Sequence, residues 1–370
     1  MQGFIVFVVF IVFIALLLIL SRKVLIHVCF FYNRGATMPI KIAILTSTED
    51  SASMNIKEKL QSMVSFSSLE DLFDGYPILR KIYRLKPNSK TSLFHILSSD
   101  PNLQISEEDL NSLFLFESER EEREIMSENG PIRLIFEDST REFQKLDEIE
   151  LFIDILKTDK PKINLDNLLD AKSLAIINDY DFIIAASRHK SEAGKPALLV
   201  HCPGNYNGAE AGGKPKSLAK SSAVLQYCLF QGLKLFKDKH HFDFPVDLEV
   251  SHHGPTELIP PIAFIELGSS ENEYNNPIGG LIIAKSILLT CFVLSNRPKG
   301  SNFGLIVGLG FGGMHYAGNF SKQLDKRYAF SHIVAKYHIG EINKDVLLQM
   351  TEKTVEKSEI LVVDWKSLKS

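Results

Sequence analysis

Pro196-Ala-Leu-Leu-Val-His201 is a short apolar run that ends in a histidine, a pattern typical of a buried strand. A glycine-rich, basic loop follows over Pro203–Lys216. In Ser217–Lys237 the leucines and phenylalanines recur near one face, which predicts an amphipathic helix. The segment therefore indicates one strand–loop–helix unit of an α/β protein.

Regular alternation of strands and helices begins with this unit and continues after it, whereas residues 66–150 are mixed. The predicted strands are Ile40–Leu45, Pro131–Glu137, Asn178–Ala186, Asp247–Ser251, Ile262–Leu267 and Gly304–Gly308. Further helices are predicted over Asn55–Val64 and Gly279–Leu294, and an acidic helical face over Glu107–Glu128. Ser187–Lys195 is predicted to be a polar, basic loop. We expect a mixed, largely parallel sheet flanked by helices, with its site beyond the carboxyl ends of strands.

Two segments divide the chain. Residues 38–370 are predicted to form one domain, with a basic, histidine-rich site half at about 187–340. Residues 1–37 are an apolar extension whose run Gly3–Leu20 is long enough to cross a bilayer. Lys and Arg only follow this run, so an anchored protein would face the cytoplasm. The alternative is a wrongly assigned start, because Met38 opens a strand of a soluble domain.

Composition is that of a globular protein, with 45% apolar residues, a net charge of −4 and a pI near 6.3. The chain as a whole is therefore not a basic nucleic-acid binder. Residues 188–220 nevertheless hold six Lys or Arg against two Glu. This basic stretch either binds phosphates or is only a solvated loop. The four cysteines form no CxxC pair and indicate reduced, intracellular thiols. Cys202, beside His201, is either a nucleophile or a small buried residue.

Three stretches rich in glycine or proline bring histidines to strand ends or to the loops after them: residues 201–205, 249–255 and 308–316. His201, His252 and His315 are the predicted metal ligands, in the tri-histidine arrangement of catalytic zinc. His252 and His253 are adjacent, so both could reach one metal only through a turn, which Gly254-Pro255 allows. We expect the three stretches to converge on one hydrolytic, metal-assisted site.

Two glutamates accompany the histidines as a further ligand or general base. The candidate catalytic residues are His252, His253, Glu249, Glu266 and His315. No HxH or HxxxH pattern identifies a metal site. The alternative is that the histidines bond the backbone or act as neutral acid and base groups.

The segment Gly308–Gly313 matches G-x-G-x-x-G, but the residues after it open a helix poorly, so a dinucleotide site is not supported. A tight loop that brings His315 and Tyr316 beside a ligand, with backbone N–H groups for a phosphate or oxyanion, is the better interpretation. The chain has neither a G-x-S-x-G elbow nor a Walker A loop, so serine-hydrolase and P-loop functions are not supported.

Taken together, these motifs resemble the D-aminoacyl-tRNA deacylase family of archaea and plants. The matching segments are His201-x-Pro-Gly-Asn205, Gly212-Gly-Lys-Pro215, Glu249-Val-Ser-His-His-Gly-Pro-Thr256, Phe264-Ile-Glu-Leu-Gly-Ser269, Gly310-Phe-Gly-Gly-x-His-Tyr-Ala317 and Lys336-Tyr337. The resemblance runs from about Met38 almost to the C-terminus. Tyr206 and Tyr274 stand where the family leads us to expect tryptophan.

The resemblance implies an esterase that removes a D-amino acid from mischarged tRNA, zinc dependence, and a fold related to peptidyl-tRNA hydrolases and phosphorylases. In a compatible mechanism, Zn²⁺ held by histidines lowers the pKa of its water, and the hydroxide attacks the ester carbonyl. His253 and Glu249 are the next candidates for ligands. The predicted substrate-binding residues are Asn205, Lys214, Lys216, Gly310, Gly312, Gly313 and Tyr316.

The expected partner is the acceptor end of D-aminoacyl-tRNA, bound by a monomer in the cytoplasm or at its membrane face. One alternative is a hydrolase of other tRNA esters or of peptidyl-tRNA. Another is a membrane-tethered tRNA-binding protein without catalysis, whose histidines are structural. Bound zinc and turnover would separate these functions.

Overall fold

The computed structural model describes residues 40–64, 66–68, 79–85, 121–127, 130–136, 151–191, 194–295 and 301–369. The chain forms two compact units, Met1–Thr37 with Phe116–Gln144, and Met38–Leu115 with Lys145–Ser370. In the first unit the structure describes one antiparallel hairpin, β4 (Glu121–Ser127) and β5 (Gly130–Phe136). The β5 strand confirms a predicted strand. The helix predicted for the acidic segment is wrong where β4 replaces it, and the apolar run Gly3–Leu20 lies outside the described residues.

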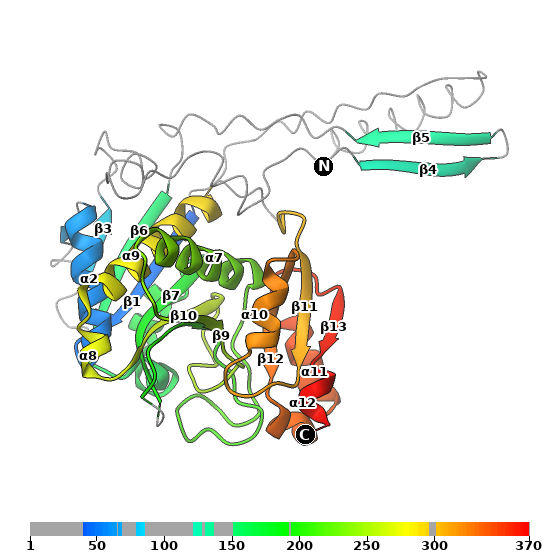
Figure 1. The fold of residues 1–370 in the computed structure, drawn as a ribbon. Helices are drawn as coiled ribbons and strands as arrows, with labels where there is room; N and C mark the ends of the chain where they lie inside the picture. The colour runs from blue at the N-terminus through cyan, green and yellow to red at the C-terminus, as the bar shows by residue number, and fades with distance from the viewer. Residues whose placement is uncertain are drawn as a thin grey trace. The chain divides into compact units, whose positions relative to one another are not determined.

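The second unit is built on an eight-stranded sheet with the order β2-β3-β6-β1-β7-β10-β8-β9 (Figure 1). Its strands are β1 (Ile40–Ser47), β2 (Phe66–Ser68), β3 (Leu79–Leu85), β6 (Leu151–Thr158), β7 (Phe182–Lys190), β8 (Ala197–His201), β9 (Val246–Leu248) and β10 (Ile262–Ser269). The pairs β6–β1, β1–β7, β7–β10 and β8–β9 are parallel, whereas β2–β3, β3–β6 and β10–β8 are antiparallel. The mixed, largely parallel sheet is therefore confirmed.

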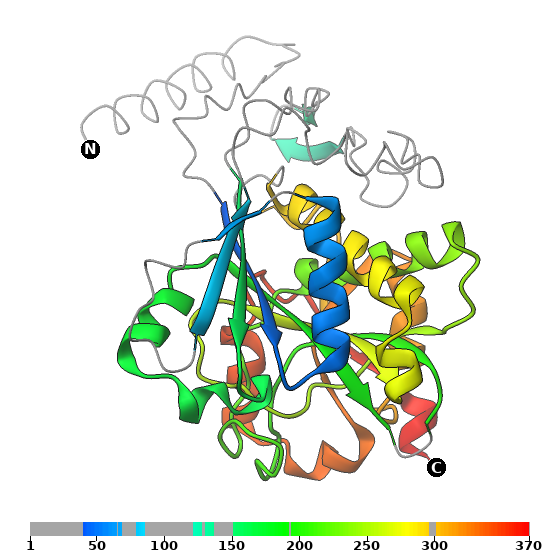
Figure 2. The same cartoon turned by 90° about the vertical axis from the view of Figure 1, so that its left-hand side faces the viewer.

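Helices cover both faces of this sheet. The helices of this unit are α2 (Ser51–Met63), α5 (Leu165–Leu168), α6 (Ala171–Ile177), α7 (Ala223–Lys239), α8 (Glu271–Tyr274), α9 (Pro277–Ser295), α10 (Gly318–Leu324), α11 (Lys344–Glu352) and α12 (Trp365–Leu368), with 3₁₀ turns η3 (Lys162–Asn164) and η4 (Lys336–Glu341), and several of them pack on the sheet. α2 and α9 pack on one face and against each other, with α7 beside α9. Figure 2 shows α2 on one side of the sheet and the short helices of residues 165–177 on the other.

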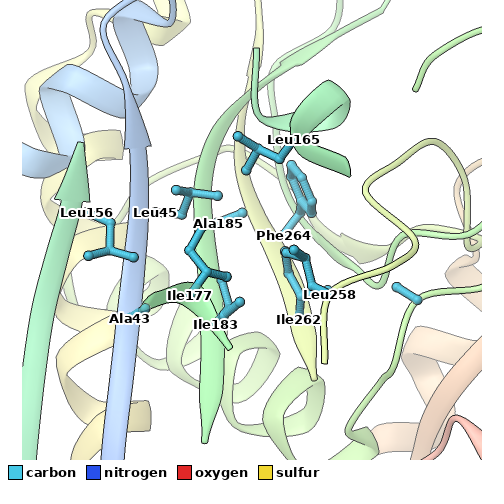
Figure 3. Close-up of a cluster of buried hydrophobic side chains, with 11 residues drawn as sticks. Ala43, Leu45, Leu156, Leu165, Ile177, Ile183, Ala185, Leu258, Ile262 and Phe264 are labelled. Carbon is cyan, nitrogen blue, oxygen red and sulfur yellow. The ribbon is translucent and has the colours of Figure 1, made fainter. Parts of the chain in front are cut away.

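One hydrophobic cluster holds the short helices to the sheet. Alternate residues of the central strands point to this face, including Ala43, Ile183 and Phe264, and meet Leu165 and Ile177 (Figure 3). The strands read as continuous apolar runs because both of their faces are covered. This packing holds the carboxyl ends of β1 and β7 side by side, where polar residues begin.

A second, three-stranded sheet has the order β12-β11-β13 and is wholly parallel. Its strands are β11 (Ile306–Phe311), β12 (Tyr328–Val334) and β13 (Ile360–Val363). β11 confirms a predicted strand and ends at the glycine loop that carries His315. α7 packs against β12 and also against β8, so it joins the two sheets.

Side-chain caps explain where two helices begin. Asp50 accepts the Ser53 N–H at 2.9 Å and starts α2 at Ser51, four residues before the predicted start. Ser222 accepts the Leu225 N–H at 3.0 Å and starts α7 at Ala223, later than the predicted Ser217. The predicted Ser187–Lys195 loop is wrong in its first four residues, because β7 continues to Lys190 alongside β10.

Among the described residues, α9 alone is long and apolar enough to cross a membrane. It is largely buried and packs against α2, α7 and β10. The composition of α9 is thus that of a core helix.

Candidate active site

The strands of the main sheet bring three polar side chains together although they run in two directions. His189 lies near the end of β7 and Glu266 in β10, its parallel neighbour. His201 ends β8, which runs antiparallel to β10, so His201 lies opposite Phe264 rather than beyond the sheet. His201 therefore ends a strand, as predicted, but this strand runs against β10. Antiparallel pairing places the end of β8 beside the amino-terminal half of β10.

Backbone hydrogen bonds dock the glycine loop of the second sheet on the segment after β9. The N–H of Val250 donates to the carbonyl of His315 at 3.1 Å, and that of Ala317 to Leu248 at 2.7 Å. The N–H of Ser251 donates to the carbonyl of Ile333 at 2.9 Å. These bonds hold His315 beside Glu249, although the two residues are distant in sequence.

Glu249 is the centre of the cluster, and its side chain is fully buried. Its Oε2 lies 3.2 Å from His201 Nδ1, and its Oε1 lies 2.9 Å from His315 Nε2 and 3.4 Å from His189 Nδ1. Burial raises the pKa of Glu249, but the imidazoles of His201 and His315 outweigh burial and hold this pKa well below its ordinary value. The carboxylate is therefore ionised at neutral pH. Neither of its oxygens has a well-aligned hydrogen-bond donor.

The adjacent histidines are fixed in one tautomer by the backbone. His252 Nδ1 lies 2.8 Å from the carbonyl of Val250, and His253 Nδ1 lies 2.6 Å from that of Gly254. A carbonyl only accepts, so each Nδ1 carries the proton and each Nε2 presents a lone pair. Burial, followed by the neighbouring His201, lowers the pKa of His252 to about 3. Burial and neighbouring histidines also hold the pKa of His253 well below its ordinary value.

The cluster has the donor set of a zinc site. His201 Nε2 lies 3.1 Å from His253 Nε2, and the ring of His252 stacks on that of His201 at 4.2 Å. Two imidazole nitrogens bound to one tetrahedral Zn²⁺ lie roughly 3.4 Å apart. If His201 carries its proton on Nδ1, toward Glu249, then its Nε2 lone pair faces the Nε2 lone pair of His253. Two lone pairs at this distance repel each other, and a cation or proton shared between the two nitrogens would relieve the repulsion.

Three sets of described residues hold potential ligand atoms within 4.8 Å of one another. They are His201, His252 and His253; His189, Glu249 and His315; and His201, Glu249 and Glu266. Imidazole nitrogens and carboxylate oxygens are the ligands of catalytic zinc. All predicted ligand and catalytic residues belong to these sets, but His315 falls in a different set from His201 and His252. The assignment of His201, His252 and His315 to one metal stays a prediction.

His189 is a member of the cluster that the sequence pattern did not indicate. Its Nδ1 lies 3.3 Å from Glu266 Oε2, and its Nε2 lies 2.9 Å from the hydroxyl of Tyr316. Burial lowers the pKa of His189, but Glu266 and Glu249 outweigh burial and raise it. The strand alternation, with His189 buried between exposed Arg188 and Lys190, is the pattern that could have identified it.

A cavity of about 390 Å³ opens beside the histidines. Its lining includes His189, His252, His253, Glu266 and His315. It also includes Asp50 and Lys162, a buried ion pair at 2.7 Å, together with Ser187 and Arg188. The N–H of Arg188 and the hydroxyl of Ser187 both donate to Asp50. Asp50 therefore balances the charge of Lys162, whereas the side chain of Arg188 is exposed.

Several predicted substrate-binding residues serve the loops around the site. Asn205 donates its amide to the carbonyls of Gly212 and Lys214, at 2.8 and 3.1 Å. Lys214 pairs with Glu257 at 2.7 Å on the surface, and the carbonyl of Lys216 accepts from Gln349 at 2.9 Å. Tyr316 does reach the cluster, through His189.

The glycine loop is occupied by internal hydrogen bonds. The N–H of Gly312 donates to the carbonyl of Val334 at 2.8 Å, and that of Gly313 to Ser367 Oγ at 2.6 Å. A Cβ at Gly310 would lie 2.9 Å from the ring of Phe320, so close packing accounts for that glycine. The expectation that this loop offers its N–H groups to an oxyanion is wrong for Gly312 and Gly313.

Cys202 is a buried structural thiol. Its Sγ lies 2.9 Å from the carbonyl of Ser331 and 3.0 Å from the hydroxyl of Ser251. Burial raises the pKa of Cys202 to about 11, so it carries almost no thiolate at neutral pH. Of its two sequence interpretations, the structure favours the small buried residue.

Comparisons with known proteins agree with the motif resemblance. The family model described as D-aminoacyl-tRNA deacylase matches residues 176–370. The D-aminoacyl-tRNA deacylases of Methanosarcina mazei and Thermococcus kodakarensis are both 31% identical to this chain, over 89% and 88% of it and 86% and 91% of their own lengths. That of Methanocaldococcus jannaschii is 37% identical over 59% of this chain and 83% of its own.

One solved structure supports the fold. A crystal structure described as a conserved protein of unknown function matches with a TM-score of 0.60 at 24% identity. The match covers 89% of this chain and 87% of that one. At this identity the likeness shows a shared α/β fold alone.

Proposed function

This chain belongs to the D-aminoacyl-tRNA deacylase family, and we propose that it hydrolyses the ester of D-aminoacyl-tRNA in the cytoplasm, releasing D-amino acid and tRNA. The observation that carries the proposal is an ionised, buried Glu249 among the imidazoles of His189, His201 and His315, beside a cavity of about 390 Å³. Ester hydrolysis needs a polarised carbonyl, an activated water and a proton for the leaving oxygen, and buried imidazoles and carboxylates supply such groups.

We propose that the cluster holds Zn²⁺, with His201, His252 and His315 as ligands and His253 or Glu249 as further ligands. Three features support this: two neutral imidazoles whose Nδ1–H is spent on backbone, the 3.1 Å approach of His201 to His253, and a buried carboxylate without aligned donors. When bound, zinc supplies a Lewis acid and a water of lowered pKa.

His189 and Tyr316 are placed to move a proton. Glu249 and Glu266 raise the pKa of His189, and its Nε2 lies 2.9 Å from the Tyr316 hydroxyl. The pair can therefore pass a proton toward the ribose oxygen that leaves. The Glu266 carboxylate accepts from Nδ1–H and orients the ring, so the proton that His189 exchanges with Tyr316 is the one on Nε2.

The cationic residues nearest the cavity fit the phosphate next to the ester. Arg188 and Lys190 line the cavity and flank His189 on β7 with their side chains exposed. Binding of tRNA through such contacts should weaken as salt rises. Lys214 is paired with Glu257, which reduces the charge that it offers to a phosphate.

The test uses D-tyrosyl-tRNA and L-tyrosyl-tRNA, each with and without a zinc chelator, and follows release of tyrosine. We expect chelator-sensitive loss of the D-ester only. Loss of the D-ester that ignores the chelator keeps the activity and rejects zinc. No loss from either ester, by folded protein supplied with zinc, rejects the proposed function.

A variant identifies the site. His252→Ala should lower both turnover and bound zinc, whereas His241→Asn, at an exposed histidine after α7, should change neither. Asparagine is chosen because His241 has a φ of 49°, which asparagine tolerates. If His252→Ala leaves turnover and bound zinc unchanged, the cluster is not the active site.

A further inference from the structure

Three large apolar side chains are exposed near the glycine loop. Met314, Tyr337 and Trp365 are 57%, 54% and 62% exposed. They belong to three different segments: the loop after β11, η4 and α12. Exposed apolar side chains that lie close together on a surface are typical of interaction sites.

Gly313 joins the three segments. Its carbonyl accepts the N–H of Lys336 at 2.9 Å, and its own N–H donates to Ser367 Oγ at 2.6 Å. Met314 follows Gly313 directly, and Tyr337 follows Lys336. Trp365 precedes Ser367 in the single turn of α12. These bonds therefore bring together, at Gly313, the segments that carry Met314, Tyr337 and Trp365, and we name these three exposed side chains the Trp365 platform.

The platform continues into the active site. His315 and Tyr316 come directly after Met314 and contact Glu249 and His189. A ligand lying on the platform would thus have one end beside the histidines.

Lysines beside Trp365 favour an anionic ligand, and the neighbouring carboxylate of Asp364 accepts a hydrogen bond from Asn319 at 2.9 Å. Lys366 and Lys369 are exposed in and after α12, and Lys369 Nζ lies 5.1 Å from the centroid of the Trp365 ring. Exposed aromatic rings interleaved with lysines are the usual surface for unpaired nucleotides, whose bases stack while their phosphates meet the cations.

We propose that the Trp365 platform stacks the unpaired bases at the 3′ end of an RNA and so presents the terminal nucleotide to the histidine cluster. The inference rests on the proposed function, because the ester to be cut lies on that nucleotide. A second copy of this chain, pairing along the edge strand β13 through Leu361 and Val363, is the competing occupant. Aromatic rings, lysines and continuity with the active site favour RNA.

A fluorescence assay tests binding to the platform without a measurement of enzyme activity. Trp365 is the single tryptophan of the chain, so tryptophan emission of the full chain reports this side chain alone. We expect the ribonucleotide CpCpA to quench it saturably, and polyphosphate, which has no bases, to leave it unchanged. Absence of quenching by CpCpA overturns the proposal. An emission change with protein concentration alone would assign the platform to a second copy and overturn it too.

Kinetic measurements on two substrates separate the contribution of the platform to tRNA binding from the chemical reaction. Trp365→Ala should raise KM for D-tyrosyl-tRNA by roughly 5- to 150-fold, the value of one base stack, and Trp365→Phe should restore most of it. With D-tyrosyl-adenosine, which lacks neighbouring bases, kcat/KM should not change. Ile259→Ala is the matched control, since Ile259 is 61% exposed and bonded to Asn178 before the amino end of β7.

Two outcomes overturn the platform: an equal loss on both substrates, or no loss on tRNA. If the wild-type chain hydrolyses neither ester, the proposed function fails, while quenching by CpCpA still decides the platform. The two failures are therefore distinguishable.

Discussion

Replacing Asp50 by asparagine breaks a buried ion pair in the cavity wall, and we expect a large loss of stability. Lys162 Nζ lies 2.7 Å from Asp50 Oδ2, with side chains 3% and 8% exposed respectively. Asparagine keeps one oxygen to cap α2, but Lys162 remains buried without its counter-charge. Removing one partner of such a pair costs about 3–5 kcal/mol in the free energy of unfolding.

Urea denaturation followed by circular dichroism measures this loss. Asp179→Asn is the matched control, because Lys41 and Asp179 form a pair of the same 2.7 Å length at the surface, where the expected loss is about 0–1 kcal/mol. The double variant Asp50→Asn with Lys162→Met removes both charges and should recover part of the loss. Equal losses for Asp50→Asn and Asp179→Asn would refute the argument from burial.

The dependence of the free energy of unfolding on pH in the acid range is an independent test of the Asp50–Lys162 pair. Burial raises the pKa of Asp50, but Lys162 and the N–H groups of Ser53 and Arg188 outweigh burial and lower it. A pKa lowered by folding contributes stability above the ordinary pKa, and that stability is lost as the pH falls through the folded value. As the pH falls below about 4, the free energy of unfolding of Asp50→Asn should therefore decrease less than that of the wild type. The same decrease in both proteins would contradict this prediction.

Three further predictions follow from single side chains. Cys202, whose pKa burial raises to about 11, should resist iodoacetamide in the folded protein at neutral pH, and rapid labelling would show that the thiol is accessible. Tyr274→Phe removes the hydroxyl that donates to the carbonyl of His189 at 2.9 Å and should lower the free energy of unfolding in urea by about 1–3 kcal/mol. Gly312→Ala, at a φ of 103°, should lower the free energy of unfolding by roughly 1–3 kcal/mol, which is measured as a lower melting temperature. Gly340→Ala, where an added Cβ has nothing within 4 Å, should not lower it.

The fold was predictable where it depends on local pattern. Short apolar runs such as Ile262–Leu267 lie within observed strands, and Gly279–Leu294 lies within α9. Apolar periodicity and chain direction are local properties, so they can be read from neighbouring residues. Helix starts were less predictable, since a cap such as Ser222 is recognisable only once its hydrogen bond exists.

The site was only partly predictable. Glycine and proline beside His252 and His315 mark turns near a site, and both residues lie in the cluster. His189 has no such neighbours, and its Arg188 and Lys190 flanks resemble a polar loop. Its role depends on strand register with β10 and on Glu249, which is sixty residues away in sequence.

The sequence by itself determined the α/β class, the family and most of the imidazoles and carboxylates of the site, because these follow from residue type and local spacing. Only the tertiary structure decided which nitrogen of His252 and His253 is free, that Cys202 is inert, and that the N–H groups of Gly312 and Gly313 are spent. Each of these properties depends on a specific partner atom or on burial. Partners distant in sequence meet only after the strands have paired and the loops have docked.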